Sequence, residues 1–284
     1  MFSGTCTAHG RKAYFSGWGI NTAVYEFDAE SGKWSTLPDC PHKSFSLVIV
    51  DGLLTAVGGT DMWKKTNKLL SYKNKKWVEN FPSMPTKRCN PAVVSNDNIL
   101  VVIGGYQENE KFDGTPDKRL ETVEIMDIKA KKWFTAAPLP YGITEGTATI
   151  CGDFLYIRGD YTSVSSFSKV VSFCSLKTLL HSNAQESSTT VWQKTESLPV
   201  NSVWCASVKG QLLAIGGMDF DIDKMTPIRR YNSVLNTWDI VSHMAIGRCH
   251  CLAAVLSDDQ LIIVGGYIDG IINKTDEVEI ASIS

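Results

Sequence analysis

Four apolar runs in this chain each stop on a pair of glycines, and no other feature of the sequence restricts its possible folds as strongly. The runs read LTAVGG, LVVIGG, LLAIGG and LIIVGG, and two weaker copies, AYFSGW and LYIRGD, bring the series to six. Features that recur at intervals of roughly 20 to 50 residues are typical of arrays of small structural units. The glycine pairs are Gly58-Gly59, Gly104-Gly105, Gly216-Gly217 and Gly265-Gly266, and the weaker copies carry Gly17-Trp18 and Gly159-Asp160.

A tryptophan recurs in phase with the glycines. After each glycine come a variable loop and an alternating stretch, such as AVYEFD or TVEIMD, and then the tryptophan. A turn follows seven or eight residues later. Two unrelated landmarks that keep one phase through five units indicate a true repeat. The tryptophans are Trp34, Trp77, Trp133, Trp192 and Trp238, and the turns fall at Pro41, Pro85, Pro140, Pro199 and Ala245.

Each unit has the pattern of four short strands with little helix signal. A four-stranded sheet cannot bury both of its faces alone, so the units are expected to pack face to face. Glycine after the second strand allows a sharp turn or a close approach, and the tryptophan fills the widening space between outer strands. The sequence therefore predicts an all-β, six-bladed propeller with four-stranded antiparallel blades in one domain, with units at about 1–41, 42–85, 86–140, 141–199, 200–245 and 246–284.

The double glycine followed by a spaced tyrosine and tryptophan resembles the Kelch repeat, and the resemblance extends over nearly the whole chain. Tyrosines stand at the matching place in three units, at Tyr25, Tyr72 and Tyr231, while Met126 replaces the tyrosine in unit three. The sixth unit has no tryptophan, so we expect its blade to lack the outer strand. Residues 276–284 would then form an exposed edge, which an upstream segment of a longer chain or a partner could cover.

Composition excludes several classes of protein. A formal net charge of −2 gives no electrostatic reason to expect nucleic acid or an anionic membrane as a partner. The apolar runs are far shorter than the roughly 20 residues that a membrane helix needs. Eight cysteines occur without a CxxC spacing, and most fall in first-strand positions, where they pack as small apolar residues. We expect a cytoplasmic protein with reduced cysteines and no cofactor.

The resemblance implies a function in protein binding. Kelch propellers that bind proteins, among them adaptors of cullin-type ubiquitin ligases, use the face that carries the loops after the glycines. Arginine and aromatic side chains are favoured at the centres of protein interfaces. The predicted partner-binding residues are Trp63, Arg88, Tyr106, Tyr161, Trp204, Arg248 and Tyr267, with the arginines facing acidic side chains of a partner. Packing between blades is the alternative for the three tyrosines, and core packing for Trp204.

The other function that we considered is a metal-dependent enzyme on a Kelch-like propeller, of the galactose oxidase or iron-dependent specifier type. Such an enzyme needs histidines and other ligands that converge on one metal ion. The five histidines, His9, His42, His181, His243 and His250, occupy different places in their units. The sequence therefore favours a non-enzymatic interaction module, an adaptor or scaffold, with no catalytic residues and no metal ligands.

Overall fold

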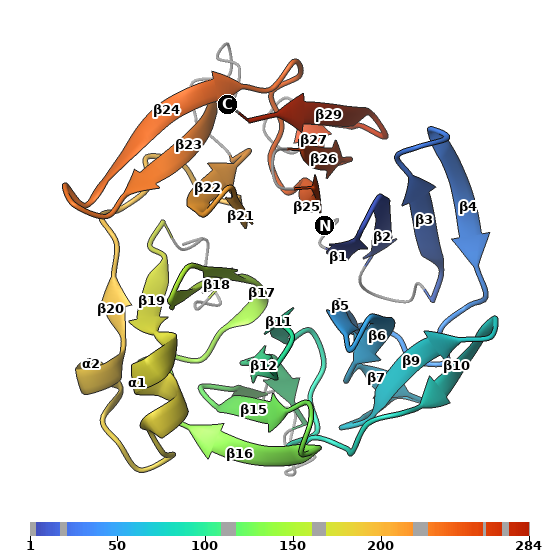
Figure 1. Ribbon diagram of the computed structural model, residues 1–284, viewed down its shortest axis with the longest axis vertical. Coiled ribbons are helices and arrows are strands. Elements are labelled where there is room, and N and C mark those ends of the chain that lie inside the picture. Colours follow the sequence, from blue (N-terminus) through green and yellow to red (C-terminus); the bar gives the residue numbers. More distant parts are fainter. Residues whose placement is uncertain are drawn as a thin grey trace.

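Six antiparallel sheets stand around a central axis like the blades of a propeller (Figure 1). The computed structural model describes residues 4–17, 22–108, 118–160, 169–217, 227–257, 260–268 and 273–283. In each blade the first strand lies at the axis and the later strands follow outward in chain order. The prediction of an all-β, six-bladed propeller is confirmed.

The first three blades have four strands each. They are β1 (Gly4–His9), β2 (Lys12–Gly17), β3 (Val24–Asp28) and β4 (Lys33–Leu37); β5 (Ser46–Val50), β6 (Leu53–Val57), β9 (Leu69–Lys73) and β10 (Lys76–Glu79); and β11 (Ala92–Ser95), β12 (Ile99–Ile103), β15 (Val123–Asp127) and β16 (Lys132–Ala136).

The last three blades differ in their outer parts. They contain β17 (Thr144–Cys151), β18 (Phe154–Asp160), β19 (Ser172–Ser175) and β20 (Gln193–Lys194); β21 (Trp204–Val208), β22 (Gln211–Ile215), β23 (Pro227–Asn232) and β24 (Thr237–His243); and β25 (Leu252–Ser257), β26 (Gln260–Val264) and β29 (Val278–Ser282). Over the described residues the sixth sheet thus has three strands, as predicted. Its outer strand exposes Val278 and Ile280, whose relative exposures are 37% and 47%.

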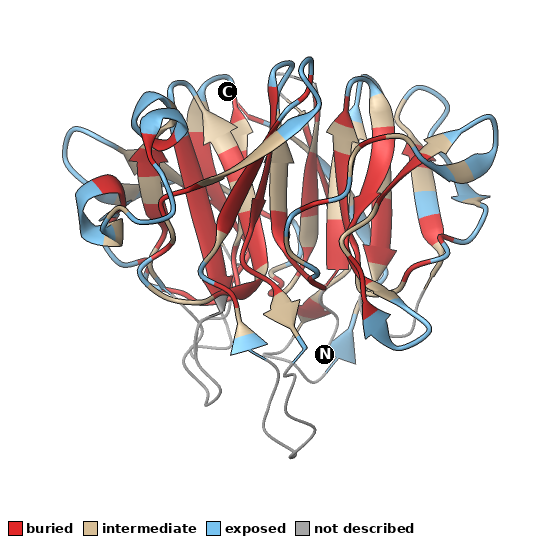
Figure 2. Ribbon diagram, turned by 90° about the horizontal axis from the view of Figure 1, so that it is seen from below, coloured by how far each residue is buried: buried red, intermediate tan, exposed pale blue. Residues whose placement is uncertain are grey.

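Short elements decorate the blades. Three two-stranded hairpins extend the loops that follow the glycine pairs: β7 (Thr60–Asp61) with β8 (Lys64–Lys65), β13 (Tyr106–Gln107) with β14 (Lys118–Arg119), and β27 (Tyr267–Ile268) with β28 (Asn273–Lys274). Two helices, α1 (Leu176–His181) and α2 (Ser188–Val191), lie between the last two strands of blade four. The hairpins lie on the lower side of Figure 2, which we call the glycine face.

The core lies between the blades (Figure 2). Strand β12 is apolar at every position, and its packing shows why. Leu100 and Val102 pack toward blade two, whereas Val101 and Ile103 pack toward blade four. Side chains of a strand alternate between the two faces of the sheet, so a strand covered on both faces needs a continuous apolar run. All four of these side chains are buried.

The tryptophans connect each blade to the one before it. Four of the five donate the indole Nε1–H to a backbone carbonyl in the connection that leads into their own blade, at donor–acceptor distances of 2.7 to 3.3 Å. Trp34 packs on Phe15 and Phe27 instead, and 42% of its surface is exposed. The four donor–acceptor pairs are Trp77 with Pro38, Trp133 with Pro82, Trp192 with Ala137 and Trp238 with Glu196.

The glycine pairs are required by conformation and by space. Gly58 has a φ of +66°, and a Cβ there would lie 2.5 Å from the carbonyl oxygen of Arg88 in the next blade. L-residues adopt such a φ only at a cost, so the position favours glycine. Gly159 differs, because it lies within β18 and its φ is not positive. A Cβ there would lie 2.9 Å from Ile143, so close packing alone explains this glycine.

The seam between blades six and one is closed by the inner strands. The Cys6 thiol donates a hydrogen bond to the carbonyl oxygen of Ala253, at a distance of 3.3 Å. Farther from the axis the two blades diverge, and a groove of about 570 Å³ opens between them. Phe15, Leu252 and Val264 contribute its apolar lining. The seam therefore has contacts near the axis and open space farther out.

Candidate functional site

The glycine face surrounds the mouth of the central channel. The connection into a blade runs beside the residues that follow the glycine pair, as in the bridge between Cys89 and Tyr106. One residue of this connection has a left-handed backbone in five blades, with φ between +49° and +56°. Hydrogen bonds pass between these residues, from the Asn90 amide to the Ser44 carbonyl, from Glu145 to Asn90 and from His250 to Ser202. Backbone hydrogen bonds thus join the rim residues of blades two, three and four, and those of blades five and six.

The channel itself is lined by the first strands of all six blades and encloses about 350 Å³. Several hydroxyl groups of these strands bind the neighbouring blade. The Thr5 hydroxyl accepts the Leu47 amide at 2.7 Å, and the Ser46 hydroxyl donates to the Pro91 carbonyl at 2.6 Å. The hydroxyls therefore stabilise the ring as well as making the channel polar.

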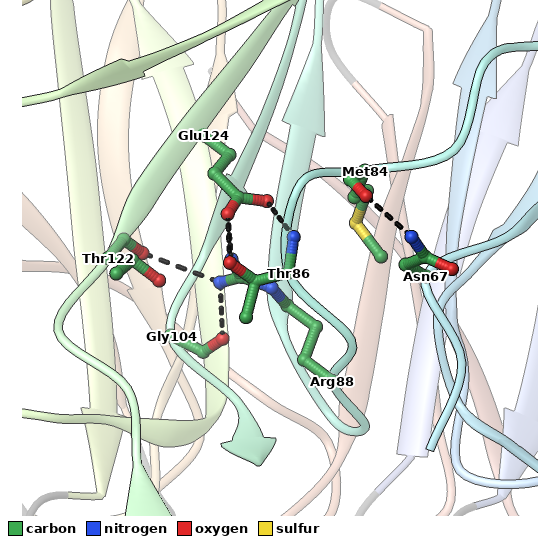
Figure 3. Close-up of polar contacts among 7 residues, drawn as sticks. All are labelled: Asn67, Met84, Thr86, Arg88, Gly104, Thr122 and Glu124. Atoms are coloured by element: carbon green, nitrogen blue, oxygen red, sulfur yellow. Dashed lines mark hydrogen bonds and ion pairs between the residues drawn. The ribbon is translucent and has the colours of Figure 1, made fainter. Parts of the chain in front are cut away.

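Arg88, a predicted partner-binding residue, is fully buried. Its guanidinium forms an ion pair with Glu124 at 2.8 Å and donates to the Gly104 carbonyl, also at 2.8 Å (Figure 3). Glu124 in turn accepts hydrogen bonds from the Thr86 hydroxyl and amide. Burial lowers the pKa of Arg88, and the carboxylate of Glu124 opposes this shift. The guanidinium thus joins the connection into blade three to that blade's second and third strands.

Arg248 repeats this arrangement in blade six. Its Nη1 donates to the carbonyls of Gly265 and Glu277, at 3.4 and 2.8 Å, and its Nη2 lies 3.5 Å from the carboxylate of Glu279. In blade two, His42 occupies the corresponding place, with Nδ1 3.0 Å from the Gly58 carbonyl oxygen. Burial lowers the pKa of His42. These three side chains brace the glycine turns.

The structure thus corrects the expected exposure of both arginines, whose relative exposures are 0% and 2%. The sequence places each arginine next to a glycine-rich loop, but it does not show the acidic partner in the third strand. In blades three and six that strand reads VEI, with the glutamate facing the arginine. An arginine 16 or 17 residues before the glycine pair, together with VEI in the third strand of the same unit, is the sequence signal that could have indicated these ion pairs.

The predicted aromatic residues fall in several environments. Tyr267 is buried, while Trp204 is half-buried and lines the channel. Tyr106 is half-buried in β13, and the guanidinium of Arg119 lies 5.8 Å from the centre of its ring. Trp63 stands out into solvent at the tip of the β7–β8 hairpin, with 87% of its surface exposed. Tyr161 and Trp18 lie outside the described residues.

Met62, which precedes Trp63, was not among the predicted residues, although it is 90% exposed. Met62 thus adds a second exposed side chain beside the predicted Trp63, while the predicted Tyr106 is half-buried next to Arg119. Arg119 was also missed, because its position in β14 follows a loop whose length gives no register. The structure brings Arg119 and Tyr106 together by direct pairing of β13 with β14.

The described residues of this face offer no cluster of metal-binding side chains. Within the described ranges, no three His, Cys, Asp or Glu side chains lie close enough together to hold a metal ion. All eight cysteines are free thiols. Burial raises the pKa of Cys174 to about 12 and that of Cys205 to about 11, so these thiols are not activated as nucleophiles. None of the helices in the described part of the chain is long and apolar enough to cross a membrane.

Comparison with known proteins agrees with this architecture. The Kelch motif matches residues 87–140. Human Kelch-like protein 23 (Homo sapiens) is 23% identical over 262 residues, which cover 88% of this chain and 42% of that protein. Kelch-like protein 36 of Bos taurus is 24% identical over 258 residues, or 84% of this chain and 38% of that protein. The chain spans about two fifths of the length of these relatives.

A solved structure, "Structure of YjhT", has the same fold. Its sequence is 18% identical to this one. The superposition covers 99% of this chain and 97% of that chain, with a TM-score of 0.71. Six blades, glycine pairs at the ends of second strands and the matched motif together define the class. These findings support a Kelch-repeat β-propeller, with the Kelch motif itself matched over residues 87–140.

Proposed function

We propose that this propeller is a non-enzymatic interaction module that binds a protein or peptide partner on its glycine face, as an adaptor or scaffold in the cytoplasm. One observation carries the proposal, namely the accessible arginine and aromatic side chains that the hairpins raise beside the channel mouth. The guanidinium of Arg119 lies 5.8 Å from the centre of the Tyr106 ring, and its Nη2 lies 3.5 Å from the tyrosine hydroxyl. Arginine and aromatic side chains combine large contact area with directed hydrogen bonds.

The rim supports binding in a second way, because it is already ordered. Backbone hydrogen bonds link the rim residues of blades two, three and four, and those of blades five and six. Little conformational entropy is then lost when a partner docks. The dispersed histidines and the lack of a three-ligand cluster among the described side chains favour binding over the metal-enzyme alternative.

The test compares two faces of the same molecule. Tyr106→Ala with Arg119→Ala alters the glycine face, while Val234→Ser with Leu235→Ser alters exposed apolar residues in a turn of blade five on the opposite face. Partners recovered from an extract of the source cells are quantified by mass spectrometry. We expect the first variant to lose its partners and the second to retain them. Equal recovery by both variants would refute binding at this face.

A further inference from the structure

The tip of the β7–β8 hairpin has an unusual composition for its shape. Thr60 pairs with Lys65 and Asp61 with Lys64, so Met62 and Trp63 form a two-residue turn. Their φ angles are +43° and +76°, which defines a type I′ turn. Such turns favour Asn-Gly, because both central residues must have positive φ. Two large L-residues are therefore held in a conformation that their Cβ atoms disfavour.

Burial does not offset the strain of the positive φ at either residue. Met62 and Trp63 are 90% and 87% exposed, whereas the repeat tryptophans are packed against neighbouring blades or aromatic rings. An exposed apolar pair on a strained turn stabilises neither the hairpin nor the core. Strained, exposed apolar residues of this kind are found where a protein binds another molecule.

The hairpin also presents the pair rigidly. Lys43 and Thr60 exchange backbone hydrogen bonds of 3.0 and 2.7 Å at its base, and the Lys65 amide donates to the carboxylate of Glu108 at 2.8 Å. The Lys43 ammonium lies 5.5 Å from the centre of the Trp63 ring. The backbone of the hairpin is thus anchored on both strands before binding, and the ammonium of Lys43 lies near the exposed indole.

We propose that Met62 and Trp63 form an anchor that inserts into an apolar pocket of a folded partner protein. The rim of that pocket carries carboxylates that face Lys43 and Lys64. The inference rests on the proposed function and assigns this hairpin as its main contact. Tryptophan is the most enriched residue at interface hot spots, and lysines beside it add steering by opposite charge.

The first experiment exploits the turn geometry. The double variant Met62→Asn with Trp63→Gly installs the sequence that a type I′ turn prefers, so we expect its melting temperature to equal or exceed that of the wild type. A melting temperature of this variant below that of the wild type would contradict the claim that the Met62-Trp63 turn is strained. Met62→Gln with Trp63→Asn replaces the apolar pair by two polar amides, of which Asn tolerates a positive φ. It serves as a second variant for all binding measurements.

The second experiment uses a benzoylphenylalanine photocrosslinker in place of Trp63, with the same group in place of Val234 as the matched control. Val234 is equally exposed, at 90%, and lies on the opposite face. In an extract of the source cells, we expect an adduct from position 63 only. Unlabelled wild type should suppress it at least tenfold, whereas the Asn-Gly variant should not. Peptide mapping should place the adduct in an apolar pocket with acidic neighbours, and Lys43→Glu with Lys64→Glu should reduce the yield at least fivefold.

Several outcomes would overturn the inference. They are an equal yield from positions 63 and 234, full competition by the Asn-Gly variant, an adduct to a second copy of this chain, or tryptophan-dependent sedimentation with phosphatidylserine vesicles. The binding proposal is judged separately. If Tyr106→Ala with Arg119→Ala loses the partner while the Asn-Gly variant keeps it, only the anchor fails. If both variants keep it, both proposals fail.

Discussion

Replacing Arg88 by methionine should destabilise the propeller more than any other single change at the glycine turns. The substitution leaves the carboxylate of Glu124 buried, with 2% of its side chain exposed and with Thr86 as its remaining partner. Removing one member of a buried ion pair costs about 3–5 kcal/mol, because the other charge stays buried without compensation. We expect a loss of this size in the free energy of unfolding.

Arg248→Met is the matched control. In that blade the two charged groups are 3.5 Å apart, and 17% of the Glu279 side chain is exposed against 2% for Glu124, so the remaining carboxylate is less completely desolvated. We expect a loss of about 1.5–3 kcal/mol, the range for hydrogen bonds to charged groups. Adding Glu124→Leu to Arg88→Met should recover part of the larger loss, because no unpaired charge remains.

The assay is equilibrium unfolding in urea, followed by tryptophan fluorescence, with the slope of the transition compared between variants. A double-mutant cycle then gives the coupling energy between Arg88 and Glu124. Two results would refute the reasoning. Arg88→Met could cost no more than Arg248→Met, or the losses of the single variants could add without coupling.

Three further predictions concern the repeat itself. Trp133→Phe removes one indole hydrogen bond and should cost about 1 kcal/mol, whereas Trp34→Phe, which loses none, should change stability little; urea unfolding compares the two. Gly58→Ala should lower the stability clearly more than Gly10→Ala. Both residues have a positive φ, which costs an L-residue about 1–2 kcal/mol, but only Gly58 lacks space for a Cβ. Thermal melts of the two variants test this difference. Burial lowers the folded pKa of His42, so the unfolded chain binds the proton first and stability should fall as the pH drops below about 6.5. Melts between pH 7.5 and 5.5 should show a smaller slope for His42→Gln; an unchanged slope would contradict the assignment.

The sequence was sufficient to predict the blades because their landmarks are local. A glycine pair follows the second strand in four of the six units, and a tryptophan marks the start of the fourth strand in five of them. Helix α1 departs from this strand pattern and lies in the long insertion between the third and fourth strands of blade four. The three-stranded sixth blade followed from the missing tryptophan.

The candidate site was less predictable, because burial of a polar side chain depends on residues far along the chain. Arg88 contacts Glu124, 36 positions away, and nothing near Arg88 indicates that contact. The strain at Met62 was also hidden, since Met-Trp has no turn signature. Only the pairing of Asp61 with Lys64 fixes the turn as two residues long.

The seam between blades six and one has a consequence for the order of folding. The hydrogen bond from Cys6 to Ala253 joins residues 247 positions apart, whereas Thr5 and Leu47, in adjacent blades, are 42 apart. Loop-closure entropy grows with the logarithm of this separation, so the seam costs about 1.6 kcal/mol more to close. Blades should therefore assemble sequentially into an open arc whose two ends join last. On heating, the same joint should part first.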